Sequence, residues 1–341
     1  MKFFATYLKT ENSKLRMLYG SAIMLLLLSV LASIALGGTR ISLTEALSAL
    51  KNNVISTDLR ILLYVRLPRT VGCIVAGAAL SVSGAIIQGV LANNLASPSI
   101  IGVNSGAALA VTVCSVLGIF GGWRLSLFAF IGAFTAVSLI SLGAMRWGAS
   151  RGTVILMGVA LNSLLNAAGD AVVSFYPTVA VMTADFKIGD FSSVSYTKLV
   201  PVAISAALAL TAVFICSSYL DVLRLGDNGA SSLGVNVKKT RVLFLLLASV
   251  LAGGAVCISG LLSFVGLLVP HTVRRLGVTA SRHLLPLCSL FGAGFVTLCD
   301  LLSRLIFAPY EIPVGIIMAF LGAPFFIVLL LRKAGDRYDK A

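Results

Sequence analysis

Side chains able to do chemistry are few and scattered in this chain. It has 2 histidines and 6 cysteines, whereas catalysis or metal binding needs several such groups at one place. His271 has no second histidine or carboxylate at ligand spacing, and His283 belongs to the next polar stretch. The cysteines lie in apolar segments without a CxxC pair, as small hydrophobic residues do. The sequence therefore predicts no catalytic residue, metal site or cofactor, and it makes His271 a structural residue at a helix end.

Polar side chains recur on one face of an apolar helix predicted at about residues 152–172. Gly158, Asn162, Asn166 and Asp170 are spaced four residues apart, so they share one side of a helix. Amides and carboxylates facing lipid are costly, so this side must contact protein or water. Either it lines a pathway across the membrane or it only forms hydrogen bonds between helices.

The elements that position these residues belong to an integral membrane protein. The 341 residues are 58% hydrophobic and 11% charged, with a mean hydropathy of +1.03, whereas a soluble domain is about 25% charged. The apolar runs last about twenty residues, which favours helices over a β-barrel. The net charge of +14 is spread between the runs, which indicates basic cytoplasmic loops and not nucleic-acid binding. The predicted fold class is an all-α membrane protein.

One apolar run complicates the number of spans. Single spans are predicted at about 18–37, 66–90, 99–119, 124–146, 152–172, 199–220, 284–305 and 312–332. Residues 242–270 are long for one crossing and short for two, and basic clusters flank them at 238–241 and 274–275. Two crossings that reverse near Gly260 keep both clusters in the cytoplasm. The result is about ten transmembrane helices with both termini cytoplasmic.

The basic residues support this topology. Most of the 26 lysines and arginines fall in segments predicted to be cytoplasmic, as the positive-inside rule requires. Residues 1–17 carry four of these charges, and the apolar run after them is too long for a signal peptide, so we expect an uncleaved first helix. The chain is predicted to be one transmembrane domain, 1–341, with a cytoplasmic segment at 1–17 and another at about 221–241.

Small residues recur every four positions in the second and third predicted spans. The first series is Gly77, Ser81, Ala85 and Gly89, and the second is Gly102, Gly106, Ala110, Cys114 and Gly118. Such series form grooves in which another helix backbone can approach closely. Small residues are also common in any membrane helix, so the series alone does not decide the packing.

Several motifs resemble one family when taken together. The chain contains RLPR at 66–69, GAALSVSGAIIQG, an Asn-x-Leu-Ala-x-Pro turn, IGVNSGA, SGLLSFVGLLVPHTVRRLGVTASRHLLP and EIPVGIIMAFLGAPFFIVLLL. In this order they closely resemble the permease subunits of the iron-siderophore, haem and vitamin B12 family of ABC importers. The matches run from about Arg66 to Arg332. One departure is Asn93-Asn94-Leu95, where the family usually has Asn-Pro-Leu.

The resemblance implies an ABC type II importer permease fold and a function. The chain would translocate an iron chelate (a ferric siderophore or haem) or a corrinoid, handed over by an extracytoplasmic binding protein. Its partners would be two ATPase subunits and a second permease subunit, identical or homologous, in a bacterial or archaeal plasma membrane. The chain has no GxxxxGK[ST] motif, so it is predicted not to hydrolyse ATP itself and not to be an enzyme. The sequence does not identify the substrate.

The resemblance also implies roles for residues at the two membrane surfaces. Arg66, Arg69 and Arg304 would receive carboxylates of the binding protein, a role that suits the planar guanidinium. Alternatively, these arginines reach lipid headgroups or cap neighbouring helices. Asn93 and Leu95 would form an inner gate, or only an ordinary turn, and Asn162 and Asn166 would line the pathway.

The segment from Leu225 to Val237 resembles the coupling helices that dock into the ATPase. The matching positions are Gly226, Asp227, Ala230, Leu233 and Gly234, and the alternative is a solvated loop. Asn228 and Gly229 replace better helix formers, so we expect a weak first helix.

Two other classes of protein remain as alternatives. An ion-coupled secondary transporter should have charged residues or broken helices at mid-membrane, and the middles of these spans are nearly free of charge. An intramembrane enzyme needs a nucleophile with a base, or a metal cluster, at one depth. No such grouping is found in the sequence.

Overall fold

The computed structural model describes residues 2–39, 42–52 and 56–338, and over these residues the chain is helical without a β-strand. The elements in chain order are α1 (Lys2–Ala35), α2 (Leu43–Lys51), α3 (Thr57–Ile61), the π-helix η1 (Leu62–Arg66), α4 (Leu67–Val90), α5 (Val103–Val116), α6 (Gly122–Arg146), α7 (Arg151–Phe175), α8 (Thr178–Met182), α9 (Ala184–Ile188), α10 (Tyr196–Ile215), α11 (Ser217–Arg224), α12 (Asp227–Ser232), α13 (Val237–Ser259), α14 (Val265–Arg275), α15 (Ser281–Leu305) and α16 (Val314–Tyr338).

Within the described residues, seven helices are long and apolar enough to cross a membrane. Helix α5 and Val314–Val328 of α16 are shorter apolar helices, and α14 is a half-length helix after the expected reversal at Gly260. This architecture confirms the predicted all-α membrane fold with about ten helices.

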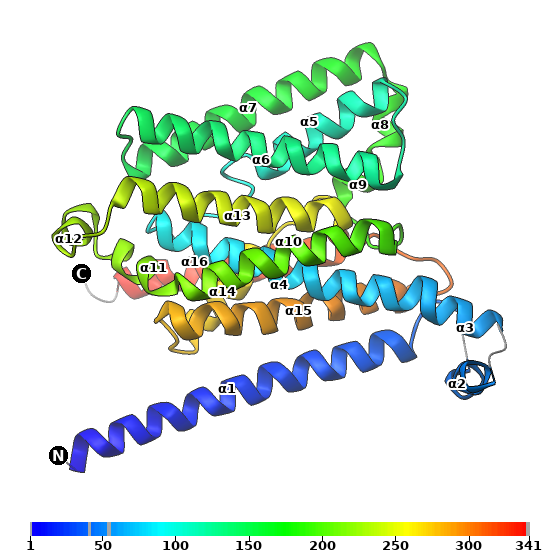
Figure 1. Ribbon diagram of the computed structural model, residues 1–341, viewed down its shortest axis with the longest axis horizontal. Coiled ribbons are helices and arrows are strands. Elements are labelled where there is room, and N and C mark those ends of the chain that lie inside the picture. The colour runs from blue at the N-terminus through cyan, green and yellow to red at the C-terminus, as the bar shows by residue number, and fades with distance from the viewer. Residues whose placement is uncertain (1, 40–41, 53–55, 339–341) are drawn as a thin grey trace.

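Helix α4 is the centre of the bundle. It packs against α13, α14 and α15, and nearly all of its residues are buried, although α7 and α10 expose most of their surface. Figure 1 shows α4 running through the middle of the molecule. Helix α4 is apolar on every side and could equally well face lipid. Its central position therefore follows from close packing with other helices and not from its hydrophobicity.

Small residues allow the other helices to approach α4. A Cβ atom at Gly77 would lie 2.3 Å from the Gly292 carbonyl oxygen of α15, and the Ser81 hydroxyl donates to the Cys288 carbonyl at 2.7 Å. In the second series, a Cβ at Gly106 would lie 2.3 Å from the Gly132 carbonyl oxygen of α6. Close packing along both series is therefore confirmed. Gly118 differs, since none of the described atoms lies within 4 Å of a Cβ there.

The tightest approach on α4 lies outside the predicted series. A Cβ at Gly84 would be 1.9 Å from the Gly266 carbonyl oxygen at the start of α14. Val82, which the series leaves out, is also fully buried. Helix α4 is therefore enclosed on several faces, and the four-residue spacing identifies only one of them.

The second span begins earlier than predicted, because α3 and η1 continue into α4. In a π-helix, an N–H group donates to the carbonyl five residues earlier, so residue 68 would pair with the Leu63 carbonyl. Pro68 has no N–H and cannot make this hydrogen bond. The Tyr196 hydroxyl of α10 donates to the Leu63 carbonyl at 2.7 Å instead. The side chain of a neighbouring helix thus satisfies the backbone group that the proline leaves open.

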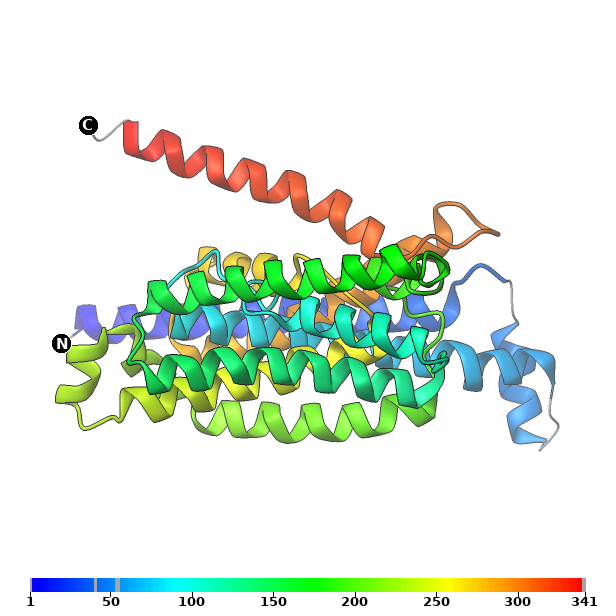
Figure 2. The same ribbon diagram turned by 90° about the horizontal axis from the view of Figure 1, so that it is seen from above.

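The two ends of the bundle agree with the predicted topology. Figure 1 places both termini and α12 at one end, and α2, α3, α8 and α9 at the other. We refer to these as the inner and outer ends. Figure 2 shows α16 leaving the bundle at an angle, and its exposed side chains include Phe320, Leu321 and Ile327.

Candidate functional site

The three predicted docking arginines meet at the outer end, but their side chains face inward. Arg66 and Arg69 are each 4% exposed, and Arg304 is 3% exposed. The Arg66 guanidinium donates to the carbonyls of Ile34, Ala35 and Thr39 at 2.6, 2.8 and 2.6 Å. It therefore caps the C-terminus of α1, where carbonyls lack helical partners. Arg66 thus behaves as in the alternative prediction, in which these arginines cap neighbouring helices. Its direct contact with a binding protein stays a prediction.

Arg69 and Arg304 share one buried carboxylate. Arg69 Nε lies 2.9 Å from Asp300 Oδ1, and Arg304 Nε lies 3.1 Å from Asp300 Oδ2. Asp300 is fully buried. Arg69 also contacts Glu311 at 2.7 Å and Asp190 at 3.9 Å, so these acids keep the paired arginines from being left uncompensated in the interior.

Sequence reasoning missed the acidic half of this network. Asp300 lies in an apolar span, four residues before Arg304, which is the spacing of an ion pair on one helix face. An acid inside a span is itself a reason to look for a buried partner. Glu311 lies in the loop after α15 and Asp190 after α9, and no spacing in the sequence connects either one with Arg69.

The third span is shorter than predicted because residues 91–102 form turns before α5. Gly102 has φ +89°, and Ala92 has φ +47°. The Asn93 side chain accepts from the Leu95 N–H at 2.9 Å, which is an Asx-turn. Leu95 is half-exposed and lies beside Phe264 and His271. The structure thus places Leu95 between α14 and α16 and Asn93 in the turn just before it, and the gating role of both residues stays a prediction.

Asn162 holds this irregular segment in place. Its amide nitrogen donates to the carbonyls of Ser99 and Ile100 at 2.9 and 2.8 Å, and its oxygen accepts from the Ser105 hydroxyl at 2.5 Å. A Cβ at Gly158 would lie 2.4 Å from the Ile100 carbonyl oxygen. Non-helical backbone at membrane depth needs such partners inside the protein. Interhelical hydrogen bonding, one of the two alternatives, therefore applies to Asn162.

Asn166 and Asp170 are exposed on the surface of this chain. Each step of four residues rotates the helix direction by about 40°, because 3.6 residues make one turn. Asn166 and Asp170 therefore point progressively away from the contact that Gly158 and Asn162 make. The face that the sequence predicts as one unit consists of an inward pair and an outward pair.

The predicted coupling segment forms a short helix at the inner end. Helix α12 follows Gly226 (φ +98°) and precedes Gly234 (φ +78°). Ala230 is fully buried, whereas Leu233 is 62% exposed. The helix has six residues, in keeping with the expected weak helix formers.

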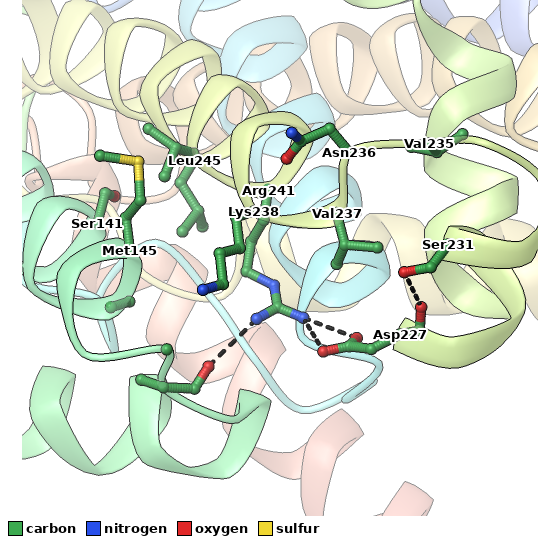
Figure 3. Close-up of a pocket in the computed structure, with 14 residues that line it drawn as sticks. Ser141, Met145, Asp227, Ser231, Val235, Asn236, Val237, Lys238, Arg241 and Leu245 are labelled. Carbon is green, nitrogen blue, oxygen red and sulfur yellow. Dashed lines mark hydrogen bonds and ion pairs between the residues drawn. The ribbon is translucent and has the colours of Figure 1, made fainter.

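Asp227 ties α12 to the bundle. Its carboxylate lies 2.8 Å from Arg241 Nη2 of α13 and 3.2 Å from Arg151 Nη2 of α7. Figure 3 shows Arg241 reaching Asp227 and a backbone carbonyl, with Lys238 beside it. That carbonyl belongs to Ala149. A cavity of about 400 Å³ lies between these residues and the end of α6.

The two histidines lie apart, and a metal cluster is not found among the described residues. They contain no group of three or more His, Cys, Asp or Glu side chains that could hold a metal ion. His283 lies 3.4 Å from the Tyr19 hydroxyl, and His271 lies beside the turn that contains Leu95.

The arrangement of helices is the type II ABC permease fold, the fold of the membrane-spanning subunit of a transporter, as comparison with a solved structure shows. A solved structure of an ABC transporter assigned to the metal-chelate type, in an inward-facing conformation, superposes with a TM-score of 0.81 and 28% identity, covering 93% of this chain and 99% of that one.

Comparison with sequence families shows the family to which the chain belongs. It belongs to the FecCD transport family, whose profile matches residues 25–332. It is 34% identical to the hemin transport system permease protein HmuU of Yersinia pestis over 94% of this chain and 97% of that protein. It is 34% identical to the vitamin B12 import system permease protein BtuC of Yersinia pseudotuberculosis, covering 80% and 82%. The family resemblance seen in the sequence is confirmed.

Proposed function

We propose that this chain is the permease of an ATP-driven importer that moves an iron chelate, haem or a corrinoid into the cell. The relatives named above carry hemin or vitamin B12, which supports this substrate class. The importer would reside in a bacterial or archaeal plasma membrane and include two ATPase subunits, a second permease and an extracytoplasmic binding protein.

The observation that carries this proposal is the exposed amide of Asn166. It lies near the middle of α7, a 25-residue span, and no described side chain or backbone group pairs with it. An amide in contact with lipid is costly, so water or a second subunit must cover this face in the membrane. A translocation pathway between two permease subunits supplies both, and Asn93 and Leu95 would close its inner end.

The inner end carries the features expected of an ATPase contact. Leu233 is exposed at the end of α12, Ala230 anchors that helix, and Asp227 connects it with α7 and α13. A force on α12 would therefore be transmitted to two spanning helices. We infer that Leu233 contacts the ATPase and that Gly226, Asp227, Ala230 and Gly234 hold α12 in position.

Docking of the binding protein can be tested through Glu311. If a carboxylate of the binding protein reaches Arg69, it must compete with Glu311, whose side chain is 39% exposed. Glu311→Gln should then strengthen docking, most clearly at low salt, because screening weakens such pairs. Unchanged affinity in Glu311→Gln would make Arg69 a structural residue only.

The experiment for the whole proposal is uptake into proteoliposomes that contain the permease, the ATPase and the binding protein. Uptake should require ATP and all three proteins. Uptake driven by an ion gradient without ATP would instead favour the secondary transporter. The ligand that co-purifies with the binding protein identifies the substrate.

A further inference from the structure

Two cavities adjoin at Lys198, near the outer end of α10. The first, of about 610 Å³, lies between α6, α10 and α13, and the second, of about 460 Å³, lies between α6, α9 and the start of α10. Both have Ser126, Lys198 and Cys257 in their walls. Figure 1 shows α6 and α10 on the two sides of α13.

The two cavities differ in chemistry. Apolar residues, including Leu127, Phe130 and Val202, line the first cavity. Trp123 lies at its outer end, where aromatic rings mark the membrane interface. Polar groups line the second, among them Asp185 and three serines of the 192–195 segment. The pair therefore forms one groove that is apolar at membrane depth and polar at the surface.

The floor of the groove is built to stay open. The Ser126 hydroxyl donates to the Cys257 carbonyl at 2.8 Å, and the Cys257 thiol donates to the Ser126 carbonyl at 2.9 Å. These reciprocal bonds join α6 to α13. Gly254 has no side chain to fill the space beside Val202, where a Cβ would lie 3.3 Å from Val202 Cγ1.

The groove carries charges of both signs. The half-buried Lys198 ammonium lies where the cavities meet, and it donates to the Ser193 carbonyl at 3.2 Å. Asp185 lies beyond it in the polar cavity, and within the described part of the chain its carboxylate has no partner. The groove thus has an apolar wall in the first cavity, a positive charge where the cavities meet and a negative charge in the polar cavity. A phospholipid with an ammonium headgroup has the complementary groups, which are an acyl chain, a phosphate and an ammonium.

We propose that this groove binds one zwitterionic phospholipid with a primary ammonium headgroup, phosphatidylethanolamine. The acyl chain lies against α10 and α13, Lys198 binds the phosphate, and Asp185 binds the ammonium. A cation and an anion in the same cavity favour this lipid over one with a neutral glycerol headgroup, which offers Asp185 no ammonium.

The test is native mass spectrometry of the purified full chain mixed with phosphatidylethanolamine or phosphatidylglycerol of identical acyl chains. The wild type should retain phosphatidylethanolamine preferentially. Lys198→Met should lower retention of both lipids by about tenfold, because a hydrogen bond to a charged group is lost, and Lys198→Arg should restore it. Asp185→Asn should retain lipid but lose the preference between the two. Lys187→Gln, an exposed lysine on α9, is the control and should behave as the wild type.

A second variant tests the apolar part without changing charge. Ser205→Phe fills the groove and should abolish retention, whereas Leu208→Phe, one turn further along α10 and outside the groove, should not. Equal retention of both lipids by the wild type, or by Ser205→Phe and Leu208→Phe, would overturn the proposal. Oxidative cross-linking of two copies through Leu127→Cys would also overturn it, because a protein would then cover the groove.

Discussion

At the scale of single residues, the outer end depends on one buried acid. Asp300 faces two guanidinium groups in the interior, and such a network costs desolvation energy that only complete pairing offsets. Arg66, which lies near Arg304 around Gly37, satisfies the end of α1 instead. The arginines therefore fix α1, α4 and α15 relative to one another before any partner binds.

We expect Asp300→Asn to destabilise the protein strongly, because it leaves buried arginines without their shared carboxylate. Breaking a buried pair typically costs about 3–5 kcal/mol. The measurement is thermal unfolding of the purified chain in detergent. Asp170→Asn removes an exposed carboxylate from α7 and should leave the unfolding temperature unchanged. Equal effects of the two variants would mean that the network is not important for stability.

At the scale of elements, the positions of helices followed from composition, but their contacts did not. The reversal at Gly260 was predictable, since basic clusters flank a run too long for one crossing. The contact of Gly84 with Gly266 was not predictable from the sequence. Every face of a membrane helix is apolar, so the hydrophobic pattern does not show which glycine packs against which neighbouring helix. The different directions of Asn162 and Asn166 on α7 were predictable in principle, because residues four positions apart are rotated by about 40° around a helix.

The contact between α4 and α15 gives a test of packing. Gly77→Leu should push the two helices apart and cost on the order of 1–3 kcal/mol, because a Cβ there already overlaps the Gly292 carbonyl. Val71→Leu, on the same helix at a position 38% exposed, adds apolar volume without a clash. Thermal unfolding should separate the two variants. Val82 also lies outside the small-residue series, but it is fully buried. A larger side chain there would meet packed neighbours, so Val82 is not a suitable control.

Helix α12 gives a test of coupling. Asp227→Ala removes the carboxylate that joins α12 to Arg241 and Arg151, so the helix should no longer transmit motion. We expect ATP hydrolysis to continue while uptake falls by about tenfold or more, since hydrogen bonds between charged groups are lost. Ser232→Ala changes an exposed residue of α12 that bonds only its own helix, and it should transport normally. Normal uptake by Asp227→Ala would place the coupling contact elsewhere.

At the scale of the whole molecule, the surface divides into faces that lipid can cover and faces that it cannot. Helix α10 exposes apolar side chains such as Val200, Ile204 and Leu208, which suit lipid. Helix α7 exposes Asn166 and Asp170 beside apolar residues. The sequence contains both patterns, but only the three-dimensional structure shows that Asn162 is satisfied and Asn166 is not. The face that we propose lines the pathway is thus marked by a polar group without a partner among the described residues.

Cysteine accessibility tests this division directly. Asn166→Cys should react with a charged, water-soluble thiol reagent in the assembled importer, because a pathway brings water to the middle of α7. Leu208→Cys lies within another span and is 68% exposed in the isolated chain, yet it should resist the reagent because lipid excludes a charged molecule. The parent protein controls for its six native cysteines, of which Cys216 is half-buried and the other five are buried. Reactivity at position 166 should also change when ATP drives the pathway open and closed. If both engineered cysteines resist the reagent in every state, α7 faces lipid or a dry interface, and the pathway must run along other helices.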